Sequence, residues 1–227
     1  MRTALPMLLG LLALAPLQAQ AGGADLLKSQ CAACHALSKP ASTSIDSLWD
    51  RKAPDLYYAG DKFNRDWLVG WLQNPTPIRP AGYPYFKNII EGPKHDEVDQ
   101  SKLKPHVHLA KADAESVADA LMALKPDGVV EKGLYKGGSV NMRMGAMTFD
   151  KFRGCVACHK GADGKGGFSG AELTDAGKRL QPDYIASFIK DPQKIDPHIW
   201  MPTLAMNDHS IQLLTGYLIQ LSKQEKK

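Results

Sequence analysis

Apolar residues recur at helical spacing in two stretches of the chain that align without gaps. The first covers residues 56–75 and the second covers residues 173–192, at a constant offset of 117. In each stretch, pairs of apolar residues one turn apart define one face of a helix, and a proline ends the pattern. Each stretch therefore predicts an amphipathic helix with one buried face: Trp67, Leu68, Trp71 and Leu72 in the first, and Tyr184, Ile185, Phe188 and Ile189 in the second.

A second pair of helices follows at a different offset. Val117, Leu121 and Leu124 match Leu214, Leu218 and Leu221 at an offset of 97. The change of offset places about 20 additional residues in the first half of this internal repeat, within residues 81–103. This insert has glycine, proline and charge but no sustained period, which predicts a loop.

The ends of the repeats suggest how the chain is divided. Residues 1–21 contain Arg2, an apolar run and the small-residue pattern Ala19-Gln20-Ala21, which is typical of a cleaved secretory signal. Glycines are frequent in residues 128–145, which predicts a linker. We therefore expect a periplasmic protein with a first domain in residues 22–127 and a second in residues 146–227.

Composition and charge narrow the possible functions. Of the 227 residues, 44% are hydrophobic, which is ordinary for a soluble globular protein, and no stretch after the signal is long enough to span a membrane. Without Arg2, 27 basic residues face 24 acidic ones, a net charge of +3. This charge is too small to favour nucleic-acid binding, although a local basic patch could attract an acidic partner.

All four cysteines lie in two copies of one motif, Cys31-Ala-Ala-Cys34-His35 and Cys155-Val-Ala-Cys158-His159. In C-x-x-C-H, the two thiols bond covalently to a haem and the histidine becomes the proximal iron ligand. A zinc site would need the two pairs closer than their separation of 124 residues, and disulfides would leave both histidines unexplained. The sequence thus predicts two covalently bound c-type haems, with His35 and His159 as iron ligands.

In each half, a short helix, the C-x-x-C-H motif, an amphipathic helix, a loop and a final helix follow one another. This order, with the Met201-Pro202 turn and Leu204 before the last helix, resembles the class I cytochrome c family, twice in tandem. The resemblance covers nearly all of the chain after the signal. It implies an all-α fold with a few short helices around each covalent haem, and it implies that Met201 is the distal ligand of the second haem.

Several residues are candidates for the distal ligand of the first haem. The offset of 97 aligns Lys104 with Met201, and Val107 and Leu109 preserve the apolar spacing of the loop, so register favours Lys104. Ligand chemistry favours His106, because deprotonating a lysine at pH 7 costs about 4 to 5 kcal/mol. Residues two apart in an extended loop also point the same way. His108, His95 and an open iron are further alternatives.

These features predict an electron carrier. With six-coordinate irons the protein would exchange electrons with periplasmic or membrane-bound redox partners and leave no place for a substrate. A nitrogen ligand in place of methionine would give the first haem the lower potential. The alternative is a haem enzyme, or the electron-accepting subunit of a dehydrogenase, that acts on peroxide or a small sulfur or nitrogen species at the irregular first haem.

Overall fold

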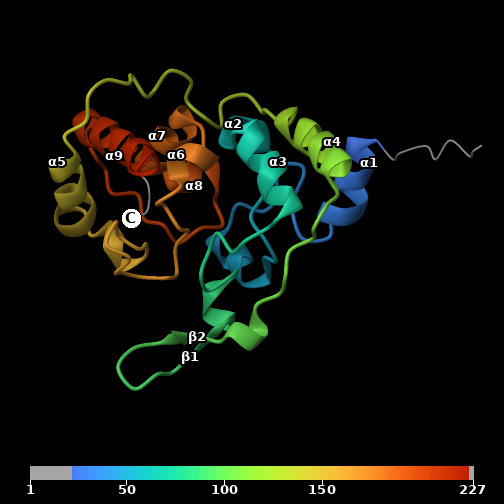
Figure 1. The fold of residues 1–227 in the computed structure, drawn as a ribbon, viewed down its shortest axis with the longest axis horizontal. Coiled ribbons are helices and arrows are strands. Elements are labelled where there is room, and N and C mark those ends of the chain that lie inside the picture. The colour runs from blue at the N-terminus through green and yellow to red at the C-terminus, as the bar shows by residue number, and fades with distance from the viewer. Residues whose placement is uncertain (1–21, 225–227) are drawn as a thin grey trace, which may run out of the picture.

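The computed structural model describes residues 22–224, and the predicted signal in residues 1–21 lies outside this range. The chain is mostly helical and forms two lobes that lie side by side (Figure 1). The first half of the repeat, coloured blue to green, forms one lobe, and the second half, coloured yellow to red, forms the other (Figure 1). The coarse expectation of a helical protein is thus confirmed, although the insert adds two short strands.

The helices of the two halves correspond. In the first half they are α1 (Gly23–Leu26), α2 (Ala59–Lys62), α3 (Arg65–Gln73) and α4 (Lys111–Met122). In the second half they are α5 (Met142–Met147), α6 (Ala176–Arg179), α7 (Pro182–Lys190), α8 (Pro192–Ile195) and α9 (Asp208–Leu221). Helices α2 and α3 match α6 and α7 at the offset of 117, and α4 and α9 begin at the offset of 97. Both offsets read from the sequence are therefore confirmed.

Short helical turns complete each half. A π-helical turn, Leu27–Cys31, continues α1, and another, Thr148–Phe152, continues α5. The 3-10 helices span Ile45–Asp50 and Cys155–Ala157. Both C-x-x-C-H motifs consequently begin where an N-terminal helix ends.

The predicted apolar faces form the core. Helix α3 packs against α4 and α7 packs against α9, and each pair buries most of the residues that the periodicity had marked. Trp67, Trp71 and Phe188 are only half-buried. The residues of these four helices that the periodicity had marked and that are buried include Leu68, Leu72, Val117, Leu121, Tyr184, Ile185, Ile189, Leu214 and Leu218.

The insert is a small hairpin rather than a featureless loop. Strands β1 (Ile89–Ile90) and β2 (Glu97–Val98) pair antiparallel between two 3-10 turns, Tyr85–Lys87 and Gln100–Lys102. The hairpin projects away from the helices (Figure 1). The loop prediction was wrong here because strands of two residues are too short to produce a detectable alternation.

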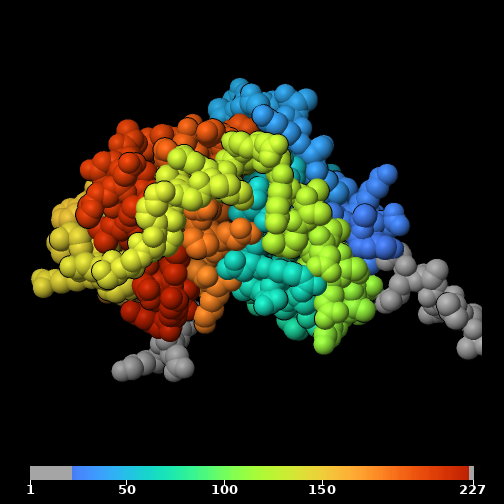
Figure 2. Space-filling view, turned by 90° about the horizontal axis from the view of Figure 1, so that it is seen from above, coloured from blue at the N-terminus to red at the C-terminus, as the bar shows by residue number. Residues whose placement is uncertain are grey.

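The predicted linker is attached to the second half. The backbone N–H groups of Gly133 and Tyr135 donate to the Asp183 carboxylate at 2.8 and 2.9 Å, and that of Lys136 donates to Gln212 at 2.8 Å. This segment runs over the surface of the second lobe (Figure 2). The boundary expected at residue 145 falls inside α5, so the irregular segment ends earlier than predicted.

The two halves meet through equivalent residues. Phe63 and Leu180, which are related by the offset of 117, form an isolated antiparallel bridge. Each half donates a backbone N–H to the other half and accepts one in return at the equivalent position, which is the arrangement of a two-fold interface. The reciprocal hydrogen bonds run from Asn64 N–H to Arg179 O and from Gln181 N–H to Lys62 O, each 2.9 Å long.

Two glycines allow helices to pack closely in both halves. A Cβ on Gly60 would overlap the Met122 carbonyl, and a Cβ on the equivalent Gly177 would lie 2.6 Å from Ile219 Cα. We expect Gly60→Ala to lower the free energy of unfolding by about 1–3 kcal/mol, as overpacking does. Urea denaturation followed by circular dichroism measures this change.

Gly70 provides the matched control for that substitution. It is exposed on α3, and a Cβ there meets nothing within 4 Å. Gly70→Ala should therefore raise the free energy of unfolding by about 0.5–1 kcal/mol, because alanine is the better helix former. Similar effects of the two substitutions would show that close packing at Gly60 is not required.

Candidate functional site

The first C-x-x-C-H motif forms a tight turn that presents its histidine to the lobe. The N–H groups of Cys34 and His35 donate to Cys31 O at 3.1 and 2.9 Å. His35 Nδ1 lies 2.7 Å from Pro54 O, so that Nδ1–H donates to this carbonyl. The free lone pair is then on Nε2, and an imidazole in this tautomer can bind a metal through Nε2.

The second motif repeats this geometry. The N–H groups of Cys158 and His159 donate to Cys155 O at 3.2 and 3.0 Å. His159 Nδ1 lies 2.7 Å from Ala171 O. Ala171 is the repeat equivalent of Pro54 at the offset of 117, so the partner that orients the imidazole is also repeated. Sequence reasoning missed both carbonyls, although alignment of the repeats would have paired them.

Burial sets the protonation states of these groups. Burial lowers the pKa of His35 and of His159, which favours the neutral imidazole that can coordinate a metal. Burial also raises the pKa of the Cys31 and Cys155 thiols. All four cysteines are free thiols, so both motifs are available for covalent attachment.

Two cations flank His35. Burial has the largest effect on the pKa of this imidazole, followed by the bond to Pro54, which raises it, and then by the charges of His106, Lys62 and Arg51, which lower it further. Burial lowers the pKa of Lys62 itself to about 7, and Lys62 makes no ion pair within residues 22–224. The buried Arg51 Nε also lacks a hydrogen-bond partner among the described residues. The first site thus has one cation near its imidazole, Lys62, that makes no ion pair among the described residues, whereas Arg51 is paired with carboxylates.

The second site has the same arrangement. Arg79 and Arg179 lie near enough to His159 to lower its pKa, after the larger effect of burial. Arg79 makes no ion pair in the described part of the chain, and the buried Nε of Arg179 has no partner there. Arg79 comes from the first half, so this site is completed across the interface.

Two of these cations make cation–π contacts with aromatic rings of the other half. Lys62 Nζ lies 5.5 Å from the centroid of the Tyr184 ring, and Arg179 Cζ lies 5.9 Å from that of Trp67. The four residues are two pairs of repeat equivalents at the offset of 117. The symmetric cation–π contacts place both sites next to the shared interface.

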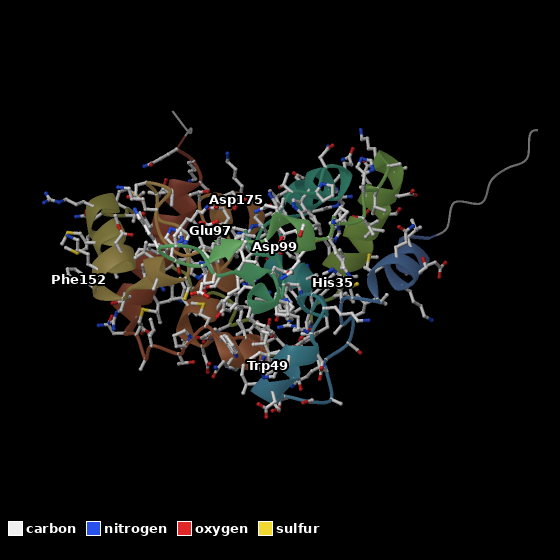
Figure 3. All side chains as sticks on the ribbon, turned by 90° about the horizontal axis from the view of Figure 1, so that it is seen from below. His35, Trp49, Glu97, Asp99, Phe152 and Asp175 are labelled. Atoms are coloured by element: carbon white, nitrogen blue, oxygen red, sulfur yellow. The ribbon has the colours of Figure 1, made fainter. Side chains whose placement is uncertain are left out.

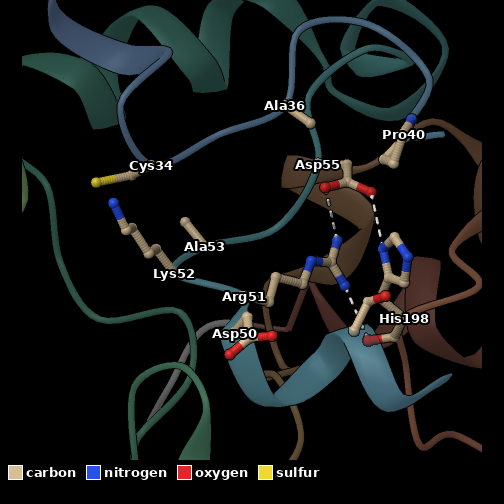
Figure 4. Close-up of a pocket in the computed structure, with 10 residues that line it drawn as sticks. Cys34, Ala36, Pro40, Asp50, Arg51, Lys52, Ala53, Asp55 and His198 are labelled. Carbon is tan, nitrogen blue, oxygen red and sulfur yellow. Dashed lines mark hydrogen bonds and ion pairs between the residues drawn. The ribbon is translucent and has the colours of Figure 1, made fainter. Parts of the chain in front are cut away.

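A buried ion-pair network fastens the halves together beside the first site (Figure 4). Arg51 donates to both carboxylate oxygens of Asp196, at 2.8 and 2.9 Å, and to His198 O at 3.0 Å. Arg51 Nη2 also lies 3.3 Å from Asp55 Oδ1. Asp55, Asp196 and His198 could together hold a metal ion, but the guanidinium already supplies the positive charge between them.

The structure separates the candidates for the first distal ligand. The ring centroid of His106 lies 6.1 Å from that of His35. Lys104 and His108 are exposed and make no side-chain hydrogen bond or ion pair within residues 22–224, and His95 lies exposed in the hairpin segment. In the second half, Met201 is half-buried between the exposed residues Trp200 and Pro202.

An exposed aromatic cluster lies next to Met201, and sequence reasoning did not identify it. Trp49 and Trp200 are 48% and 45% exposed, and their ring centroids are 5.5 Å apart. Phe86 of the insert contacts both rings, at 4.5 and 5.8 Å. Trp49 marks this cluster at an edge of the molecule (Figure 3).

The residues present fit a covalent haem at each site. Each site has two free thiols and an imidazole with an available Nε2. Each also has a cation near its imidazole that makes no ion pair among the described residues, Lys62 in the first and Arg79 in the second, and these cations could pair with the carboxylates of a haem. A zinc site is a poorer fit, because it would give Lys62 and Arg79 no anionic partner.

Comparison with protein-family models, curated proteins and solved structures finds no match for this chain. Among the described residues, no helix has the length and apolar character needed to cross a membrane. The two motifs and the geometry of the two sites are therefore the features of this chain that bear on its function.

Proposed function

We propose that the protein is a periplasmic di-haem c-type cytochrome that transfers electrons between redox partners. The observation that supports this most directly is the repeated C-x-x-C-H turn, in which each imidazole donates Nδ1–H to an equivalent carbonyl. A haem supplies reversible one-electron chemistry at its iron, and the protein sets its potential and access. In this proposal each half is a class I cytochrome c-like domain.

The chain's own groups perform the attachment and the positioning. Each thiol would add across one vinyl group of a haem, so that an S–H bond would break, S–C and C–H bonds would form, and no group would leave. His35 and His159 would hold the irons through Nε2, and Met201 would supply a further ligand at the second site. Lys62 and Arg79 would pair with haem carboxylates, and Arg51 and Arg179 would add positive charge near the same two sites.

Several features support electron transfer over catalysis. The enzymatic alternative needs an open distal position at the first iron, and the ring of His106 stands close to His35 on that site. Lys62 and Arg179, which act on the imidazoles of the two sites, each contact an aromatic ring of the other half, so both sites would lie near the interface, a placement compatible with electron exchange between them. The exposed cluster of Trp49, Trp200 and Phe86 offers a surface at which a redox protein can dock.

Counting covalent haems tests this function. The chain, expressed with a cytochrome c maturation system, should gain the mass of two haems in denaturing mass spectrometry. Cys31→Ser with Cys34→Ser should remove one of them, and Cys155→Ser with Cys158→Ser should remove the other. A chain that carries zinc or no covalent haem would refute the proposal.

A further inference from the structure

We infer that His106 is the distal ligand of the first haem, so that the protein combines a bis-histidine site with a histidine–methionine site. This inference rests on the proposed function, since it requires a haem held by His35. It assigns the ligand that the repeat alone leaves open.

The distance between the two imidazoles is the first argument. The ring centroids of His35 and His106 are 6.1 Å apart, and the rings are inclined at 58°. Two imidazoles bound on opposite sides of one metal ion, with metal–nitrogen bonds of about 2 Å, have ring centres roughly 6 Å apart. The two rings therefore stand at the separation that one shared iron requires.

The tautomer of His106 is the second argument. His106 Nδ1 lies 2.8 Å from Val107 O, so that Nδ1–H donates to a backbone carbonyl. His35 has the same arrangement with Pro54 O. In both residues Nε2 is left with its lone pair, and a hydrogen bond from the other nitrogen is the usual support of a metal-binding histidine.

The packing of the ring is the third argument. His106 is exposed overall, but its ring lies against Trp71, with centroids 4.6 Å apart. Trp71 is itself fixed, because its Nε1–H donates to Thr76 O at 3.0 Å. Three residues after His106, the N–H of Leu109 donates to Leu72 O at 3.0 Å and ties the loop to α3. These contacts hold the ring beside His35.

The competing candidates lack such support. Lys104 is exposed, and in the part of the chain that the structure describes its side chain makes no hydrogen bond or ion pair. His108 is likewise exposed there, and His95 Nδ1 lies 3.0 Å from Asp96 O within the hairpin segment. The helices of the two halves keep their register. The side chain near His35 is nevertheless that of His106, two residues after Lys104, the position that aligns with Met201.

Spectroscopy of the oxidised two-haem protein tests the assignment. Low-temperature EPR and near-infrared magnetic circular dichroism should show one low-spin methionine-type haem and one low-spin bis-histidine haem. His106→Ala should convert the bis-histidine haem to a high-spin haem that binds carbon monoxide after reduction. Lys104→Ala and His108→Ala are the matched controls in the same loop, and both should leave the spectra unchanged.

A second variant keeps the test independent of loop stability. His106→Met should replace the bis-histidine signal by a second methionine-type signal. It should raise the potential of that haem by at least the ~59 mV that corresponds to a tenfold change in a one-electron equilibrium. The inference would be overturned, and the proposed function kept, if His106→Ala left the spectra of both haems unchanged or if Lys104→Ala opened one haem to carbon monoxide. A chain without covalent haem would overturn the proposed function as well.

Discussion

Replacement of Arg51 by methionine is expected to lower the free energy of unfolding by about 3–5 kcal/mol, because it leaves buried carboxylates without their cation. The side chains of Arg51 and Asp196 are only 6% and 4% exposed, and the pair joins the two halves of the chain. Burial already raises the pKa of the neighbouring Asp55. Without the guanidinium, the site must take up a proton or admit water, and either change destabilises the fold. Denaturation with guanidinium chloride, followed by circular dichroism, measures the loss.

Arg65 gives a matched control for the loss of an arginine ion pair. Its partner is Asp119, and the two side chains are 42% and 62% exposed. Solvent screens such a pair, so that Arg65→Met should leave the free energy of unfolding nearly unchanged. Equal losses for the two variants would mean that burial of the Arg51 network contributes nothing to the attachment of the halves.

The elements of the fold follow from the sequence because their signals are local and repeated. Apolar spacing located α3 and α7, and both helices stop before the prolines that the pattern marked. Comparison of the repeats then located α4 and α9 and the insert between the two offsets. Each of these inferences uses residues within one helix or their counterparts in the other half, so no knowledge of the tertiary structure is needed.

The contacts that complete the sites could not be found in the same way. The Asp196 carboxylate that pairs with Arg51 is 145 residues away in the chain, and nothing in either local sequence marks the pair. The meeting of His106 with His35 depends on the path of an extended loop after a hairpin that periodicity does not predict. Register favoured Lys104, since alignment compares positions in the sequence, whereas the 6.1 Å between the rings of His106 and His35 is a distance in space that alignment does not report.

Met201→Ala is expected to lower the reduction potential of one haem by more than about 59 mV, a tenfold change in the one-electron equilibrium, and to leave the other nearly unchanged. A methionine sulfur favours ferrous iron, so that its loss stabilises the ferric state at the second site alone. The two imidazoles belong to different lobes and each has its own backbone acceptor, which is why the effect should stay local. Spectroelectrochemical titration of the purified protein separates the two potentials.

Met206 is the control for that substitution, because it lies in the same loop but packs against the hydrophobic core. Met206→Leu should change stability slightly through altered packing and leave both potentials where they were. If Met206→Leu, and not Met201→Ala, removes the methionine-type near-infrared signal, then Met206 is the ligand. Equal shifts of both potentials in Met201→Ala would instead show that the two sites are not electronically separate. A selective shift in Met201→Ala would show that the methionine raises the potential of the second haem in the unaltered protein, where electrons would then settle if the first haem has a nitrogen ligand in place of methionine.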